Sequence, residues 1–237
     1  MAGHSKWKNI KHKKAATDKL KAKKFAKLLK EITVCAKVSG GDINSNPTLR
    51  TLILKANEIN MPKDNYLRAI KKGTGEIISN AYETSWYEGY GPFGIAVIVE
   101  VLSDNKNRAI SEIRAAFNHN GGSIGEEGSV SWMFEKKGLI NAISENFNEE
   151  ELIELLSNFE IDDINIENNE FQIISSINSF NEIKNILLKN KFKIEESTIG
   201  YKAKNEINLD ENQQETVLKF LENLEELDDT QNIYTNF

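Results

Sequence analysis

The segment from residue 6 to residue 30 carries the side chains whose type and spacing could perform a recognisable chemistry. It holds eleven lysines at short intervals. Each ammonium could neutralise a backbone phosphate and release its counterion, and Trp7 could stack on an exposed base. This pattern predicts nucleic-acid binding. The predicted contact residues are Lys6, Trp7, Lys8, Lys11, His12, Lys13, Lys14, Lys19, Lys21, Lys23, Lys24, Lys27 and Lys30.

The choice of lysine over arginine predicts how such binding would work. Arginine can form two parallel hydrogen bonds with guanine, whereas lysine acts as a point charge. The whole chain contains four arginines, at positions 50, 68, 108 and 114. We therefore expect binding that is dominated by phosphates and guided by shape, with little sequence preference.

Basic and acidic residues are segregated along the chain. Residues 1–72 hold 18 Lys and Arg against 5 Asp and Glu, and the chain totals of 30 and 36 leave 12 against 31 for residues 73–237. Such asymmetry is typical of a nucleic-acid-binding segment attached to an acidic body, which the same polyanion repels. The alternative interpretation is that the lysines form only a solvated helix face.

Residues typical of catalysis or metal binding are scarce. The histidines are His4, His12 and His119, without the spacing of a catalytic triad or a zinc protease, and the lone Cys35 excludes a cysteine-based zinc site. The glycine-rich segment 121–129 follows a helix and precedes a strand, the reverse of a phosphate cradle, so we interpret it as a turn. We expect a non-enzymatic protein without metal, cofactor or small-molecule substrate.

The aromatic residues outside the basic segment have a simpler interpretation. Tyr87 and Tyr90 flank a glycine-rich turn and could stack on bases, but aromatic residues beside a turn more often pair across a hairpin or fill the core. We interpret Trp86 and Trp132 in the same way, as core residues, with Trp132 in a strand.

The elements that must position the basic side chains are helical. The spacing of Phe25, Leu28, Leu29, Ile32, Cys35 and Ala36 predicts a helix that begins after Thr17-Asp18 and ends at Gly40-Gly41. Asn46-Pro47 and Asn60-Met61-Pro62 each begin a further helix, the last of which ends at Gly73. The joint between these two helices resembles a helix-turn-helix, which adds Lys63, Arg68, Lys71 and Lys72 to the predicted contacts.

After residue 77 the pattern changes to strands alternating with helices. Strands at 82–90, 95–101 and 129–134 with a helix at 105–119 form a ββαβ unit, and residues 138–199 follow the ferredoxin-like order βαββαβ. The last helix and a strand at 231–235 cannot bury their apolar residues by themselves, so we assign both elements to the ββαβ unit. The prediction is a three-domain α+β protein: a basic arm plus three-helix domain over 1–77, a discontinuous α/β domain over 78–136 and 206–237, and an inserted ferredoxin-like domain over 137–205.

Short motifs spread over nearly the whole chain point to one family. The motifs are Met1-Ala2-Gly3-His4-Ser5-Lys6-Trp7, Lys13-Lys14-Ala15-Ala16, Gly40-Gly41-Asp42 with Asn46-Pro47, Tyr87-Glu88-Gly89-Tyr90-Gly91-Pro92, Ser103-Asp104-Asn105-Lys106-Asn107-Arg108, Gly121-Gly122, Gly128-Ser129-Val130, and Asp228-Asp229-Thr230-Gln231-Asn232-Ile233-Tyr234. With these motifs the chain resembles the YebC family, whose members are described as probable transcriptional regulators and include the mitochondrial translational activator of cytochrome c oxidase.

The resemblance implies a cytoplasmic, non-catalytic protein of three domains that acts as a DNA-binding transcriptional regulator. It also leaves open a ribosome-associated translation factor that binds ribosomal RNA or tRNA and assists the synthesis of proline-rich stretches. The lysine-rich composition with one tryptophan slightly favours the second. A third class is a protein-interaction scaffold that uses the acidic face. No run approaches the roughly 20 apolar residues of a membrane span, so we expect no membrane partner.

Overall fold

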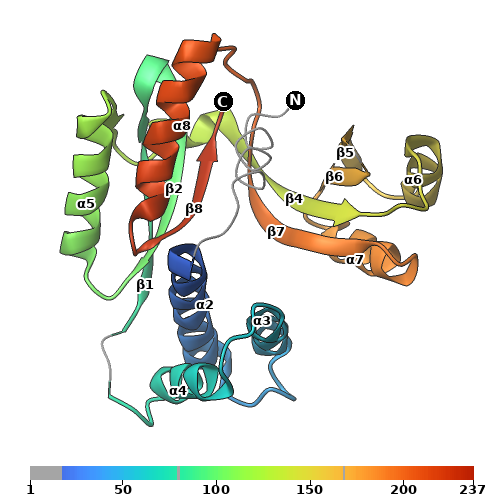
Figure 1. Ribbon diagram of the computed structural model, residues 1–237, viewed down its shortest axis with the longest axis horizontal. Helices are drawn as coiled ribbons and strands as arrows, with labels where there is room; N and C mark the ends of the chain where they lie inside the picture. The colour runs from blue at the N-terminus through green and yellow to red at the C-terminus, as the bar shows by residue number, and fades with distance from the viewer. Residues whose placement is uncertain (1–17, 79–80, 168) are drawn as a thin grey trace.

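The computed structural model describes residues 18–78, 81–167 and 169–237, which form a group of helices and two four-stranded antiparallel sheets. In Figure 1 the two sheets stand side by side, each with its own pair of helices, and the N-terminal helices lie below them. The predicted α+β class is confirmed. The division into three domains at the stated boundaries stays a prediction.

Three helices follow the predicted order at the N-terminal end: α2 (Asp18–Ser39), α3 (Pro47–Glu58) and α4 (Lys63–Gly73). The Asn46 side chain accepts a hydrogen bond from the Leu49 amide at 3.0 Å, so it caps α3 as the Asn46-Pro47 pair predicts. Gly40, at φ +84°, follows the end of α2. The predicted apolar stripe of α2 is confirmed, since its six residues are buried in, or packed against, the core that these helices share.

The first sheet has the strand order β3-β1-β2-β8, with every neighbouring pair antiparallel. One face of it is covered by α5 (Lys106–His119) and α8 (Glu211–Glu226). Alternate residues of β2 point to this face, and Val97, Val99 and Val101 are fully buried there. The strands are β1 (Glu83–Tyr90), β2 (Ala96–Ser103), β3 (Ser123–Ile124) and β8 (Thr230–Thr235). The chain's last strand therefore completes a sheet that begins with β1.

The predicted strand at 129–134 is wrong. Residues Ser131–Met133 form a short 3-10 turn (η2), and the next strand, β4 (Phe134–Ile143), begins at Phe134. The reason is that the backbone amides of Val130 and Ser131 donate to the carboxylate of Glu88 and not to a neighbouring strand. A two-residue strand at Ser123–Ile124 pairs with β1 instead.

The second sheet has the strand order β5-β6-β4-β7, and its elements follow the predicted order βαββαβ. Two helices, α6 (Glu149–Leu156) and α7 (Phe180–Lys189), pack on one face around a core that includes Ile140, Phe171 and Ile173. The strands besides β4 are β5 (Ile161–Glu167), β6 (Glu170–Ser175) and β7 (Lys193–Ala203). Of the residues between β5 and β6, Asn168 lies outside the described residues, and Asn169 has φ +65°.

Candidate nucleic-acid interface

More than half of the predicted contacts in the basic segment cannot be placed. Lys19 and Lys21 belong to α2 by their backbone. Seven others lie outside the described residues: Lys6, Trp7, Lys8, Lys11, His12, Lys13 and Lys14. Their role in binding stays a prediction.

The four remaining predicted contacts on α2 have different surroundings. Lys24 is exposed, whereas Lys23 and Lys27 are half-buried. The Lys27 ammonium donates to the backbone oxygen of Gln231 at 3.5 Å. This contact places one side of α2 against the C-terminal strand β8, so the lysines of α2 do not form one free basic face.

Lys30 is bound to the body of the molecule. Its ammonium lies 2.6 Å from Oδ1 of Asp229, donates to the backbone oxygen of Asp228 at 2.8 Å, and lies 5.8 Å above the ring of Tyr82. The chain before β8 supplies both aspartates. Lys30 thus joins the N-terminal helices to the C-terminal segment, a partner that the sequence did not reveal.

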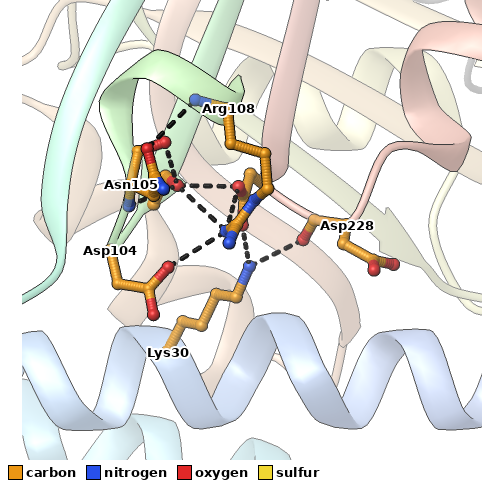
Figure 2. A network of polar contacts seen from close by, with 7 residues as sticks. Lys30, Asp104, Asn105, Arg108 and Asp228 are labelled. Atoms are coloured by element: carbon orange, nitrogen blue, oxygen red, sulfur yellow. Dashed lines mark hydrogen bonds and ion pairs between the residues drawn. The ribbon is translucent and has the colours of Figure 1, made fainter. Parts of the chain in front are cut away.

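The same aspartate also holds Arg108, a residue of α5. Figure 2 shows Arg108 in one network of polar contacts with Lys30 and Asp104. Oδ2 of Asp229 accepts hydrogen bonds from Nη2 of Arg108 at 2.8 Å and from Oγ of Ser103 at 2.7 Å. Arg108 makes a second ion pair with Asp104 at 3.0 Å, and these two carboxylates raise the pKa of the guanidinium. We call Lys30, Ser103, Asp104, Arg108 and Asp229 the junction network. It joins three segments that are far apart in the sequence.

The charge at the centre of the junction network is stabilised by hydrogen bonds. Burial by itself raises the pKa of Asp229, whose side chain is 4% exposed, but donors from Lys30, Arg108 and Ser103 outweigh that effect and lower the pKa. Asp229 is therefore charged at neutral pH and holds two cations in place.

The predicted contacts on α4 lie at the surface. Lys63, Arg68 and Lys71 are exposed and Lys72 is half-buried. Lys71 and Lys72 also lie in the last turn, where a positive charge is favoured by the helix dipole. Arg68 and Lys71 are three residues apart and share one side of the helix. The helix-turn-helix role of α3 and α4 stays a prediction.

A buried carboxylate that the sequence analysis did not single out shapes the glycine-rich loop. Glu88 is 8% exposed, and its carboxylate accepts hydrogen bonds from the backbone amides of Gly128, Val130 and Ser131 at 2.8–3.0 Å. Burial raises the pKa of Glu88, but these three bonds outweigh it and lower the pKa. The loop is thus held by one carboxylate, with the geometry of a fixed turn.

The interpretation of both tryptophans as core residues is wrong. Trp132 lies in the 3-10 turn with 63% of its surface exposed, and Trp86 in β1 is 43% exposed. Tyr87 is buried in the core of the first sheet, as predicted. Tyr90 is exposed, and its hydroxyl donates to the backbone oxygen of Ser129 at 3.2 Å.

The described residues contain no group of three or more His, Cys, Asp and Glu side chains placed to hold a metal ion. In the same part of the chain, no helix has the length and apolar character needed to cross a membrane. His119 lies at the end of α5, with Nδ1 2.7 Å from the Ala115 oxygen.

Two family models match this chain over separate ranges. Residues 5–76 match the family described as the TACO1/YebC protein N-terminal domain, and residues 82–237 match the TACO1/YebC second and third domain.

Full-length similarity is found among curated proteins and a solved structure. Proteins named "Probable transcriptional regulatory protein" from Geobacter sulfurreducens and Dictyoglomus turgidum are each 46% identical to this chain, over 100% of it and 96% of the relative. The crystal structure of a conserved hypothetical protein from Aquifex aeolicus superposes with a TM-score of 0.85 at 40% identity, covering 96% of this chain and 94% of that one. These similarities extend over nearly the whole chain.

Proposed function

The chain belongs to the TACO1/YebC family, and from that premise we propose that it is a non-enzymatic regulator of gene expression that binds nucleic acid through phosphates. The observation that carries the proposal is the density of lysine at the N-terminal end, eleven between residues 6 and 30, on a chain whose remainder is acidic. Its relatives are named as transcriptional regulatory proteins, which makes DNA the first target to test.

The described geometry refines which cations take part. Lys24, Lys63, Arg68 and Lys71 are exposed on α2 and α4 and are available to phosphates. Lys30 instead anchors α2 to the body through Asp229. We therefore assign Lys30 to positioning the basic segment and leave phosphate contact to the exposed residues and to Lys6, Lys8, Lys11, Lys13 and Lys14 with their neighbours.

A ribosome-associated translation factor is the second candidate function. The observation that favours it is the composition of the basic segment, which has lysines and one tryptophan but no arginine before residue 50. Such a segment supplies charge and stacking without the bidentate readout of base edges. Ribosomal RNA would satisfy those requirements as well as duplex DNA would.

Parallel binding measurements on the full chain separate the candidates. We would measure its affinity for random-sequence duplex DNA and for purified ribosomes between about 50 and 200 mM salt, the range over which phosphate contacts weaken strongly. Saturable DNA binding without ribosome association would exclude the translation factor. Binding to ribosomes alone would exclude the DNA regulator, and binding to neither would overturn the proposal in favour of a protein scaffold.

A charge-matched pair of variants tests the basic segment. Replacing Lys6, Lys8, Lys11, Lys13 and Lys14 with Gln should make the slope of log affinity against log salt shallower by about 4 for duplex DNA. The control replaces five exposed lysines outside that segment, Lys106, Lys189, Lys191, Lys193 and Lys219, with Gln. Equal effects of the two variants would show that only net charge matters.

A further inference from the structure

Three aromatic rings from three different strands meet where the two sheets adjoin. Trp86 of β1 stacks on Tyr234 of β8 with centroids 6.3 Å apart, and Tyr201 of β7 lies edge-on to both, at 5.5 Å from Trp86 and 5.4 Å from Tyr234. Tyr234 is 3% exposed and Trp86 is 43% exposed. The ring of Tyr234 thus lies buried beneath the exposed ring of Trp86.

The cluster is rigidly supported from below. Tyr234 belongs to a buried group with Ile98, Val130 and Phe134, against which Tyr201 packs. A Cβ atom at Gly200 would lie 2.7 Å from Cε1 of Tyr234, so the absence of a side chain there allows the ring to approach β7 closely. The exposed rings are thus held in position before any ligand arrives.

Lysines gather beside these rings in a part of the chain that is otherwise acidic. Lys136 of β4 is paired across the ladder with Tyr201, and its ammonium lies 5.5 Å above that ring. Lys137 of β4, Lys202 of β7 and Lys204, which directly follows β7, each make an ion pair with a carboxylate. Lys136 makes no ion pair with any described residue, so its charge is available.

A second exposed aromatic pair extends this surface along β1. Nε1 of Trp132 and the hydroxyl of Tyr90 both donate to the backbone oxygen of Ser129, at 3.1 and 3.2 Å. The Lys204 ammonium donates to the Trp132 oxygen at 2.9 Å. Trp86 and Tyr90 are four residues apart on one face of β1, a separation of about 13 Å. We call Trp86, Tyr90, Trp132, Tyr201 and Lys136 the aromatic platform.

We propose that the aromatic platform is a second nucleic-acid site, separate from the basic segment, which binds single-stranded polynucleotide by stacking bases on Trp86 and Trp132. Exposed aromatic rings beside an unpaired lysine are the features that bind single strands, because every base offers a flat face and every linkage offers a phosphate. A duplex keeps its base faces stacked internally and cannot use them. On the β8 side the Glu100 carboxylate accepts a hydrogen bond from Asn232 at 2.7 Å, and its negative charge would repel phosphates, which favours a path for the strand on the Lys136 side.

This inference rests on the proposed class of ligand, nucleic acid, but its test uses a protein that lacks the tryptophan ring and the lysine charges of residues 6–14. The protein is the full chain with Trp7→Phe and with Lys6, Lys8, Lys11, Lys13 and Lys14 replaced by Gln. Since the chain has three tryptophans, the remaining tryptophan fluorescence comes from Trp86 and Trp132 alone. The probes are twelve-nucleotide oligouridylate, oligothymidylate of equal length and a twelve-base-pair duplex.

The single strands should quench the tryptophan fluorescence, and the duplex should not. Trp132→Ala and Lys136→Glu should each weaken single-strand binding about fivefold. Two controls should retain the binding: Trp132→Phe, which keeps an aromatic ring, and Lys106→Glu, which makes the same charge change away from the aromatic platform. A preference between the RNA and DNA strands would identify the natural polymer.

Several outcomes would overturn the platform. These are no single-strand binding in this background, equal quenching by the duplex, or affinity indifferent to both Trp132→Ala and Lys136→Glu. Quenching by a lysine-rich peptide in place of the oligonucleotides would identify a protein-binding surface instead. If this background variant kept its affinity for ribosomes and for duplex DNA, the role of residues 6–14 in binding would be contradicted. That result would not affect the test of the aromatic platform, which depends on the Trp132 and Lys136 variants.

Discussion

Glu88 and Asp229 are carboxylates with little exposed surface, and both lie in motifs that the sequence displays openly. Their partners are distant in the chain: the Glu88 carboxylate binds amides about 40 residues away, and Ser103 bonds to Asp229 across 126 residues. Spacing along a sequence cannot reveal such pairs. The sequence therefore displays the motifs but does not reveal which two residues organise them.

The lowered pKa of both groups predicts how stability depends on pH. A carboxylate whose pKa is lower in the folded state contributes stability that is complete above its unfolded value and is lost as pH falls through the folded value. We expect the contribution of these two carboxylates to the free energy of unfolding to be constant above about pH 5.5 and to fall as the pH drops below about 4. Glu88→Gln should reduce stability by about 2 kcal/mol at pH 7 and make the acid-dependent loss shallower.

Urea unfolding between pH 3 and pH 7 measures both effects. Glu126→Gln is the matched control, because Glu126 is exposed on the loop that Glu88 holds. That variant should follow the unmodified chain at every pH. If Glu88→Gln also followed it, the three amide bonds to Glu88 would not stabilise the fold.

At the scale of elements, local signals predicted the helices well. The Asn46-Pro47 start of α3 and the glycine end of α2 are decided within a few residues, and both are confirmed. The strand at 129–134 failed because its backbone donors are taken by Glu88, a long-range competitor that local pattern cannot show. Trp86 was wrongly placed in the core because an aromatic residue has the same pattern on either side of a strand. Trp132 was wrongly placed there because the strand predicted around it is a 3-10 turn.

The contact between α2 and α4 depends on a residue without a side chain. A Cβ atom at Gly73 would lie 2.3 Å from the backbone oxygen of Thr33 and 2.7 Å from Cβ of Ala36. Gly73→Ala should therefore lower the free energy of unfolding by about 2 kcal/mol, although alanine is the better helix former. Chemical denaturation followed by circular dichroism would measure the loss.

Gly75→Ala separates steric overlap from backbone strain. Gly75 has φ +83° and open space where a Cβ would stand, so only the cost of the left-handed conformation, about 1 kcal/mol, should appear. If Gly73→Ala lowered the free energy of unfolding no more than Gly75→Ala does, α2 and α4 would move apart at little cost.

At the scale of the whole molecule, composition alone predicted a basic segment on an acidic body. It could not show how the two are joined, because Lys30 looks like every other lysine of its helix. The structure assigns it to the junction network, in which α2, α5 and the segment before β8 meet at Asp229. The attachment of the N-terminal helices thus depends on a residue that sequence reasoning counted among the phosphate contacts.

Variants of two lysines on α2 separate the attachment of this helix to the body from the binding of nucleic acid. Lys30→Gln removes an ion pair to a buried carboxylate and should lower the free energy of unfolding by about 2 kcal/mol, with the salt dependence of nucleic-acid binding unchanged. Lys24→Gln, on an exposed residue of the same helix, should leave stability unchanged and make the salt slope for duplex DNA shallower by about 1. Urea unfolding and binding titrations on the same preparations measure both. If Lys30→Gln instead altered the salt slope and left the free energy of unfolding unchanged, Lys30 would be a phosphate contact. The junction network would then not stabilise the fold.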